Sequence, residues 1–269
     1  MEIGYIELEG IRLRDDPARD ACFRVVRRDS EMHEYDRDTD AGARETVHRH
    51  MSNEITSLDI AAQMLVEFPE APWDLQMELA RQAWDEARHV AVLHRRLVEM
   101  GGFKGEFPIA TFEWSITCSL DTIAARLATQ NRTFEAGAMD VVKSLARGFR
   151  GIGDEETSAV LDGILADEIQ HVRFANRWIK RLAEQDRRVL MKVAFAVRFI
   201  AEVNSRFAAQ DGEINANGRK LQDHTETIPA VNIEDRKLAG FSDEEVHEVL
   251  RQAGFRSLLP DEPRPEVAS

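Results

Sequence analysis

Apolar residues recur every three or four positions along most of the chain, which is the spacing of amphipathic helices. The pattern predicts five helices, over about residues 43–68, 73–100, 111–149, 154–185 and 186–210. The first four are separated by segments that contain proline or glycine, at 69–72, 101–102 and 151–153. We expect a kink or a break inside the third helix. Because helical periodicity dominates, the pattern predicts an all-α fold.

Both ends of the chain differ from this helical centre. Apolar and charged side chains alternate in residues 6–13 on either side of a glycine, which predicts a short hairpin. A polar loop at 211–217 is followed by a small helical unit that Ser242 can cap, and by a tail at 260–269 rich in Pro and Glu. We therefore predict an N-terminal extension at 1–42, a helical bundle at 43–210, and a C-terminal helical extension with a tail at 211–269.

The motif Glu-x-x-His occurs four times, as Glu45/His48, Glu86/His89, Glu168/His171 and Glu244/His247. So short a motif cannot identify a site by itself, but helix geometry can separate the four pairs. A ligand in the interior of a bundle must project from the apolar stripe of its helix, at about 100° per residue. Glu86 does so, because its neighbours within roughly 60° round the helix include Leu75, Leu79, Ala83, Val90, Leu93 and Leu97.

The other three pairs do not all pass this test. Glu168 shares the apolar stripe of Leu161, Ile164, Leu165, Val172, Ala175, Ile179 and Leu182. Glu244 and His247 point away from the apolar face of Val246, Val249, Leu250 and Ala253, which predicts a solvent-exposed pair. Glu45 lies about half a turn from Glu54 on the same helix, so we expect at most one of those two side chains to be interior.

Two further glutamates, Glu54 and Glu135, also lie on apolar stripes. The stripe of Glu54 contains Val47, Leu58, Ala61 and Leu65, and that of Glu135 contains Ala124, Ala128, Met139, Val142 and Ala146. An ionised Glu in an apolar interior is costly unless it is paired or bound to a metal. Four carboxylates and two imidazoles from four helices match the ligand set of a carboxylate-bridged dinuclear metal site. The alternative is a buried hydrogen-bonded polar network, or helices shifted in phase by a kink.

Residues 43–185 resemble the ferritin-like di-iron carboxylate superfamily. The run Asp85-Glu86-Ala87-Arg88-His89 looks like the Asp-Glu-x-Arg-His signature of the bacterial multicomponent monooxygenases, and residues 167–171 form a second copy with Gln in place of Arg. The resemblance implies a ferritin-like four-helix bundle with an additional fifth helix. It also implies that Asp85 and Asp167 hydrogen-bond His171 and His89 crosswise. Their alternative role is that of plain surface acids.

The resemblance implies a ligand assignment as well. Glu86 and Glu168 are expected to bridge the two ions and are the catalytic candidates, while Glu54 with His89 and Glu135 with His171 complete the two ligand sets. Hard carboxylates with two imidazoles favour iron or manganese, because zinc sites prefer fewer ligands and thiolates. We therefore expect two iron ions, or one manganese and one iron ion.

Several branches of this superfamily fit the chain poorly. A ribonucleotide-reductase radical subunit needs a tyrosine beside the metal, whereas Tyr5 and Tyr35, the only tyrosines, both precede the bundle. The Cys-rich iron module of rubrerythrins is absent, and ferritin storage subunits are shorter. The expected function is a non-haem di-iron oxygenase or oxidase that uses O2 to hydroxylate, N-oxygenate or oxidatively cleave a small organic substrate. The alternatives are a ferroxidase that handles iron without an organic substrate, and a structural bundle without metal.

Three more polar residues lie close to the expected centre. Asn131 and Arg132 fall within one turn of Glu135 and are candidate substrate contacts, although Arg132 can equally extend to solvent. His50 lies one turn before Glu54. We expect it to be an outer hydrogen-bonding group or an extra ligand, with a plain buried histidine as the alternative.

Charge and composition narrow the partners. A net charge of −14 argues against a nucleic-acid groove, which needs clustered Lys and Arg. The first residues lack the apolar core of a signal peptide, and no uncharged run is long enough to span a membrane, so we expect a cytoplasmic protein without a membrane partner. The oxygenase interpretation implies an external electron donor, a reductase or a ferredoxin. A homodimer is the usual expectation for the assembly.

Overall fold

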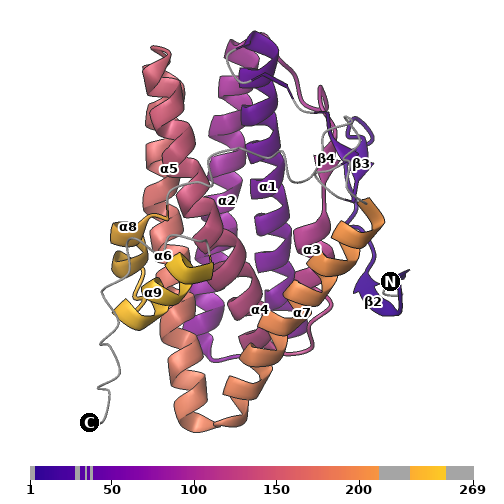
Figure 1. Ribbon diagram of the computed structural model, residues 1–269, viewed down its shortest axis with the longest axis vertical. Helices are drawn as coiled ribbons and strands as arrows, with labels where there is room; N and C mark the ends of the chain where they lie inside the picture. Colours follow the sequence, from indigo (N-terminus) through magenta and orange to yellow (C-terminus); the bar gives the residue numbers. More distant parts are fainter. Residues whose placement is uncertain (1–3, 28–30, 34, 37–38, 212–230, 253–269) are drawn as a thin grey trace, which may run out of the picture.

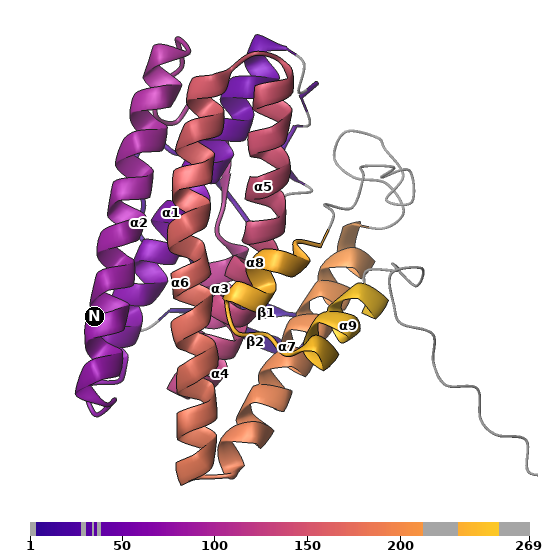
Figure 2. The same ribbon diagram turned by 90° about the vertical axis from the view of Figure 1, so that its left-hand side faces the viewer.

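The computed structural model describes residues 4–27, 31–33, 35–36, 39–211 and 231–252. Four long helical segments lie side by side along the length of the molecule (Figures 1 and 2). They are α1 (Asp40–Glu67), α2 (Trp73–Glu99), the segment that ends in α5 (Ala136–Gly151), and α6 (Glu155–Gln185). Helix α1 packs closely on α2, and α5 on α6. The structure is mostly helical, which confirms the predicted all-α class.

Side-chain caps determine where these helices begin. The Thr39 hydroxyl accepts a hydrogen bond from the Gly42 N–H, so α1 starts three residues before the expected position. Asp154 caps α6 in the same way by accepting from the Thr157 N–H at 2.9 Å. Gly153, at the turn between α5 and α6, has a φ of +87°, a conformation that residues with a side chain rarely adopt. These local signals explain why the predicted bounds of the helices are close to the observed ones.

The predicted third helix is broken, as expected. It consists of α3 (Phe112–Thr117), α4 (Ile123–Thr129), the π-helical turn η2 (Gln130–Glu135) and α5. The Thr122 hydroxyl caps α4, and the chain then continues through η2 into α5 without a loop. A π turn contains more residues per turn than an α-helix and is often found at functional sites.

The N-terminal region covers one side of the bundle. Strands β1 (Tyr5–Leu8) and β2 (Ile11–Arg14) pair antiparallel, which confirms the predicted hairpin. Leu8 and Leu13 pack with Ile116 and with Ile200 and Val203 of α7 (Arg188–Asp211). Two short strands, β3 (Val25–Val26) and β4 (Ile109–Ala110), form a parallel pair nearby.

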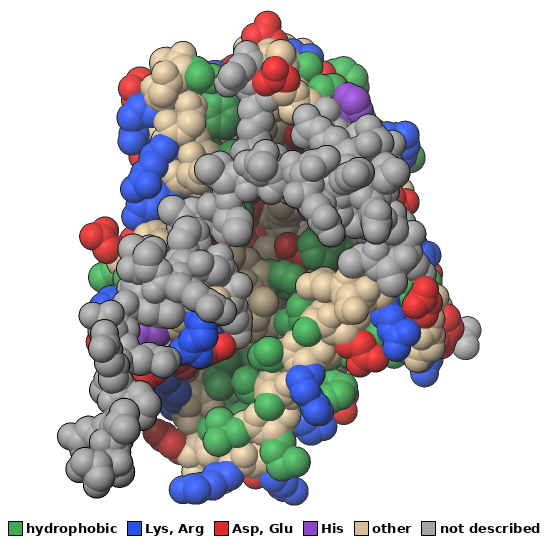
Figure 3. Space-filling model, in the orientation of Figure 1, with side chains coloured by type: hydrophobic (Ala, Val, Ile, Leu, Met, Phe, Trp, Pro, Cys, Tyr) green, Lys and Arg blue, Asp and Glu red, His purple; other side chains and the backbone are tan. Residues whose placement is uncertain are grey.

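Helix α7 crosses the lower part of the bundle at an angle (Figure 1). Figure 3 shows apolar side chains gathered along this helix, and Leu190, Met191, Phe195 and Val197 are among its exposed residues. None of the described helices combines the length and the apolar character that crossing a membrane requires.

Two short helices follow at the C-terminal side, α8 (Ile233–Leu238) and α9 (Asp243–Gln252). The Ser242 hydroxyl accepts a hydrogen bond from the Glu245 N–H, which confirms the predicted cap of α9. The predicted loop at 211–217 lies outside the described residues except for Asp211, which ends α7, and so does the predicted tail at 260–269.

Candidate metal centre

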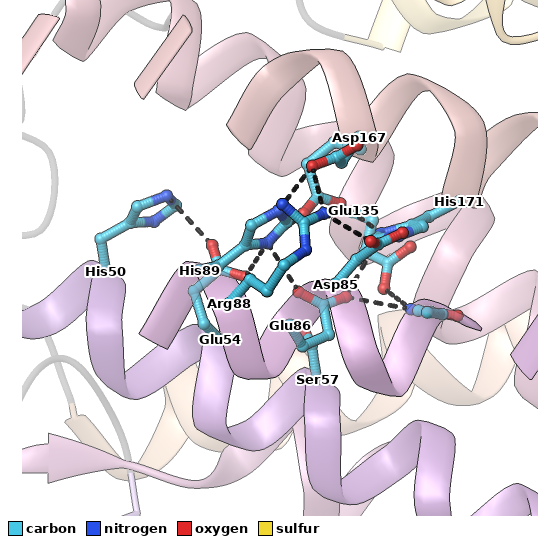
Figure 4. A network of polar contacts seen from close by, with 12 residues as sticks. His50, Glu54, Ser57, Asp85, Glu86, Arg88, His89, Glu135, Asp167 and His171 are labelled. Carbon is cyan, nitrogen blue, oxygen red and sulfur yellow. Dashed lines mark hydrogen bonds and ion pairs between the residues drawn. The ribbon is translucent and has the colours of Figure 1, made fainter. Parts of the chain in front are cut away.

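The structure brings the six predicted ligands together in the middle of the bundle (Figure 4). They come from α1, α2, η2 and α6, and they form two overlapping groups whose ligand atoms lie within 4.8 Å of one another. One group is Glu54, Glu86, His89 and Glu168, and the other is Glu86, Glu135, Glu168 and His171. All six side chains are buried. Glu86 and Glu168 belong to both groups, so each can reach two ions.

Both imidazoles turn the Nδ1 atom inward. The Nδ1 atom of His89 lies 3.2 Å from Glu54 Oε2 and 3.1 Å from Glu86 Oε2. The Nδ1 atom of His171 lies 3.3 Å from Glu86 Oε1 and 3.4 Å from Glu168 Oε2. Each histidine therefore brings its Nδ1 atom against carboxylate oxygens from its own helix and from a neighbouring one.

The outward Nε2 atoms contact two aspartates crosswise. His89 Nε2 lies 3.2 Å from Asp167, and His171 Nε2 lies 3.3 Å from Asp85, the arrangement that the resemblance implied. Arg88 donates to both aspartates and links the two pairs. Burial opposes a charge on Asp85, but its hydrogen bonds with His171 and Arg88 hold the pKa of that carboxyl well below its usual range. An ionised Asp85 accepts a hydrogen bond from the Nε2–H of His171, and in the neutral imidazole this favours the tautomer whose Nδ1 can bind a metal.

Gln82, which the sequence analysis did not identify, completes the inner hydrogen-bond network. Its side-chain amide is fully buried, donates to Glu135 and lies 3.3 Å from Glu86. Its oxygen accepts from Asn131, which also donates to Glu135 at 2.8 Å. A signal was available, because Gln82 lies one turn before Glu86 on the same apolar stripe.

The structure does not bring Arg132 to the six ligands. Its guanidinium points outward, where it donates to Asn176 at 2.7 Å and forms an ion pair with Glu245. Asn131 does lie beside Glu135, but as a donor to that carboxylate. Of the two candidate substrate contacts, only Asn131 is therefore part of the centre.

His50 lies against the centre without joining either ligand group. Its Nε2 atom is 3.1 Å from Glu54 Oε1, although the two atoms are not aligned for a hydrogen bond. Burial and, to a lesser extent, the neighbouring His89 together lower the pKa of His50 to about 4. A neutral imidazole at this position restricts the Glu54 side chain.

The two discarded Glu-x-x-His pairs lie elsewhere. Glu244 is exposed, as the helix phase predicted, whereas His247 is half-buried. The expectation that at most one of Glu45 and Glu54 is interior is wrong, because their exposed fractions are 7% and 4%. Glu45 faces away from the centre and pairs with Arg49, on a side of α1 where His48 packs against Phe23 and Phe107. The helix phase was correct, because Glu45 and Glu54 lie on different sides of α1. The N-terminal region, however, also covers the side that carries Glu45.

A family model described as "Protein of unknown function (DUF455)" matches residues 6–247. The chain belongs to the DUF455 family. The match runs from β1 to α9 and so includes all six clustered residues and both aspartates. No curated protein and no solved structure matches this DUF455 chain.

The pKa shifts at the centre of this DUF455 chain show that its buried carboxylates are stabilised by nearby positive charge. Burial raises the pKa of Glu54 and Glu135, and neighbouring carboxylates raise both further. Burial would lower the pKa of His89, but hydrogen bonds with Glu54 and Glu86 outweigh it and raise the pKa to about 11. The pKa of His171 is also raised well above its ordinary value, because Glu168 and Asp85 outweigh the effect of burial. Protons compensate the carboxylates in this state.

The residues present fit divalent metal ions. Glu168 Oε2 and His171 Nδ1 are buried and lack a hydrogen-bond partner although they lie 3.4 Å apart. Such orphaned buried polar atoms are costly unless a ligand satisfies them. Two divalent cations would balance the four carboxylates and leave both imidazoles neutral, which is the form that binds metal. The cluster is therefore placed to hold metal, and its oxygen and nitrogen donors suit hard or borderline cations.

Proposed function

We propose that this protein is a ferritin-like di-metal carboxylate protein that uses O2 to oxidise a small organic substrate. One observation carries the proposal: two buried ligand groups share Glu86 and Glu168, each completed by one further Glu and one His. A single-metal site does not require shared carboxylates. The Glu and Glu-x-x-His ligands from four helical segments are those of a ferritin-like bundle.

The expected cofactor is a pair of iron ions, with manganese and iron as the mixed alternative. A pair of ferrous ions supplies two electrons for the reduction of O2. Glu86 and Glu168 would each serve both ions, and Glu54 and Glu135 would each serve one. The hydrogen bonds of Asp85 and Asp167 with the imidazoles keep the ligand nitrogens oriented.

Oxidation of an organic molecule requires access to the centre from outside. A pocket of about 70 Å³ lies between α2 and α6, and Gln82 and His171 form part of its wall. Arg81, Arg173 and Arg177 also line it. Such a pocket suits a small molecule or a small part of a larger one.

The proposal includes an external electron donor and a cytoplasmic homodimer. Trp73 and Trp84 are exposed on the outer face of α2, with 70% and 65% of their surface accessible. Because large exposed aromatic residues are enriched at protein interfaces, this face supports an interaction with another protein.

Metal analysis tests the proposal directly. We expect two iron or manganese ions per chain in protein prepared without chelators, and O2 consumption by the ferrous protein. Glu86→Gln should lose both ions, because this carboxylate serves both groups. Glu244→Gln, which changes an exposed Glu of the same motif, is the matched control and should keep both. Full-length protein that binds well under two ions, or equal metal loss in the two variants, would contradict the proposal. Accumulation of many ferric ions per chain would instead favour iron handling.

A further inference from the structure

The small unit formed by residues 231–252, which contains α8 and α9, packs against the bundle beside α5 and α6 (Figure 2). We call it the C-terminal unit. Its buried apolar residues, Ala239, Phe241, Val246 and Leu250, belong to the same core cluster as Met139, Val142 and Val172 of the bundle. The C-terminal unit is therefore an integral part of the fold.

Arg132 joins this unit to the π turn that carries Glu135. The guanidinium donates to Glu245 of α9 and, at 2.7 Å, to Asn176 of α6. It also lies over the ring of Phe241, 4.9 Å from the centroid. Asn176 in turn donates to the Ala239 carbonyl at 2.9 Å. Three elements thus meet at one side chain, three residues before a predicted metal ligand.

Glu245 has two roles in this contact. One carboxylate oxygen accepts from the Ser242 N–H at 2.8 Å, which forms a capping box with the Ser242 hydroxyl at the start of α9. The other oxygen receives Arg132. The capping interaction therefore orients the Glu245 carboxylate toward the guanidinium of Arg132. The resulting hydrogen bond is charge-assisted.

A second anchor lies on the other side of Glu135. Arg236 of α8 is buried and donates to the carbonyl of Ala136, the residue that follows Glu135, at 2.9 Å. It also forms an ion pair with Asp140 at 2.6 Å. The C-terminal unit therefore contacts the chain on both sides of the ligand, at the Arg132 side chain before it and at the Ala136 carbonyl after it.

The π turn is a rare conformation that occurs mostly as a single turn inside an α-helix, frequently at a functional site, and here it is held from two sides. From inside the bundle, Gln82 and Asn131 hold the Glu135 carboxylate. From outside, Arg132 holds the turn itself. We propose that Arg132 is a positioning residue through which the C-terminal unit fixes Glu135 at the metal centre. This inference rests on the function proposed above.

Cobalt(II) titration of the full-length metal-free protein tests the inference. Arg132→Ala should weaken one of the two ions about tenfold, because outer-shell changes commonly cost 10–100-fold in metal affinity. The weakened ion is the one that Glu135 and His171 bind, and the visible absorption of bound cobalt should change with it. Arg132→Lys keeps the charge and should restore part of the affinity. Glu245→Gln, a milder change at a partly exposed position, should weaken the same ion in the same direction.

Lys237→Ala is the matched control. Its ion pair with Asp243 lies wholly within the C-terminal unit, at 2.7 Å on the surface, and the variant should bind both ions as the wild type does. Circular dichroism should report the same helical content for all variants.

Hydrogen exchange in the metal-free protein gives an independent readout. The segment 130–137 should exchange faster in Arg132→Ala than in the wild type or in Lys237→Ala. Unchanged cobalt affinities and unchanged exchange in Arg132→Ala would overturn the inference. A wild type that binds no cobalt would overturn the proposed function, and the exchange comparison would then decide separately whether the C-terminal unit fixes the turn.

Discussion

Metal binding should release protons, and its stabilising effect should grow with pH. In the metal-free protein the pKa of His89 is raised to about 11, and that of His171 is also raised well above its ordinary value. Both imidazoles are therefore protonated at neutral pH and each must lose a proton to bind an ion. We expect the release of about two protons for the pair of ions, before any contribution from Glu54 and Glu135.

The sign of the effect follows from the direction of the pKa shifts. A histidine whose pKa is raised on folding stabilises the metal-free protein fully below its unfolded pKa of about 6.5, and this stability is lost as the pH rises toward the folded pKa. In the metal-bound protein both imidazoles are neutral, so its folding stability does not fall in this way as the pH rises. Two protons correspond to about 2.7 kcal/mol per pH unit. The stabilisation by saturating metal should therefore increase by about that amount between pH 7 and 8.

Urea unfolding at pH 7.0 and 8.0, with and without saturating cobalt(II), measures this difference. A pH indicator in weakly buffered solution counts the protons released during the titration. The same measurements on Glu244→Gln control for ions bound at the surface. Stabilisation that does not change with pH, together with release of less than one proton per pair of ions, would refute the assignment of His89 and His171 as ligands.

Three other substitutions test separate parts of the site and the core. Asp167→Asn replaces the charged acceptor of His89 by a neutral amide and should weaken one ion by about 10–100-fold in a metal titration, with little change in helical content. Equal affinity would assign Asp167 to the surface. Gln82→Leu keeps the size of a buried side chain but removes the donor to Glu135, so it should weaken the binding of one ion about tenfold. Unchanged affinity for both ions would show that Glu135 does not need this hydrogen bond. Leu93→Ala, in the fully buried core, should lower the free energy of unfolding by about 2–5 kcal/mol in urea, and a loss below 1 kcal/mol would contradict the packing.

The sequence predicted the clustered residues because helical phase is a local property. Glu86 and Glu168 occupy positions where Leu, Val and Ala otherwise recur, and a regular helix preserves that relation over its whole length. The same reasoning correctly placed Glu244 on an exposed surface. The prediction failed for Glu45 because its burial depends on chain segments far away in the sequence.

Contacts between distant parts of the chain also explain why Arg132 and the pairing of two short strands were not predicted. Arg132 pairs with Glu245, which is 113 residues away, and no periodic pattern indicates such a contact. Gln82 was missed because a single amide on an apolar stripe has many ordinary explanations. The pairing of β3 with β4 likewise brings together two short segments that are distant along the chain.

The π turn makes the centre depend on a residue count as well as on residue types. An α-helix advances about 100° per residue, so removing one residue from Gln130–Glu135 would turn either Glu135 or Asn131 away from the centre. No side chain need change for the ligand set to be broken. In this segment a deletion of one residue should therefore be more damaging than most substitutions. Members of the DUF455 family can be compared by the length of the segment between Thr122 and Gly151, in addition to the identity of the residue that aligns with Glu135.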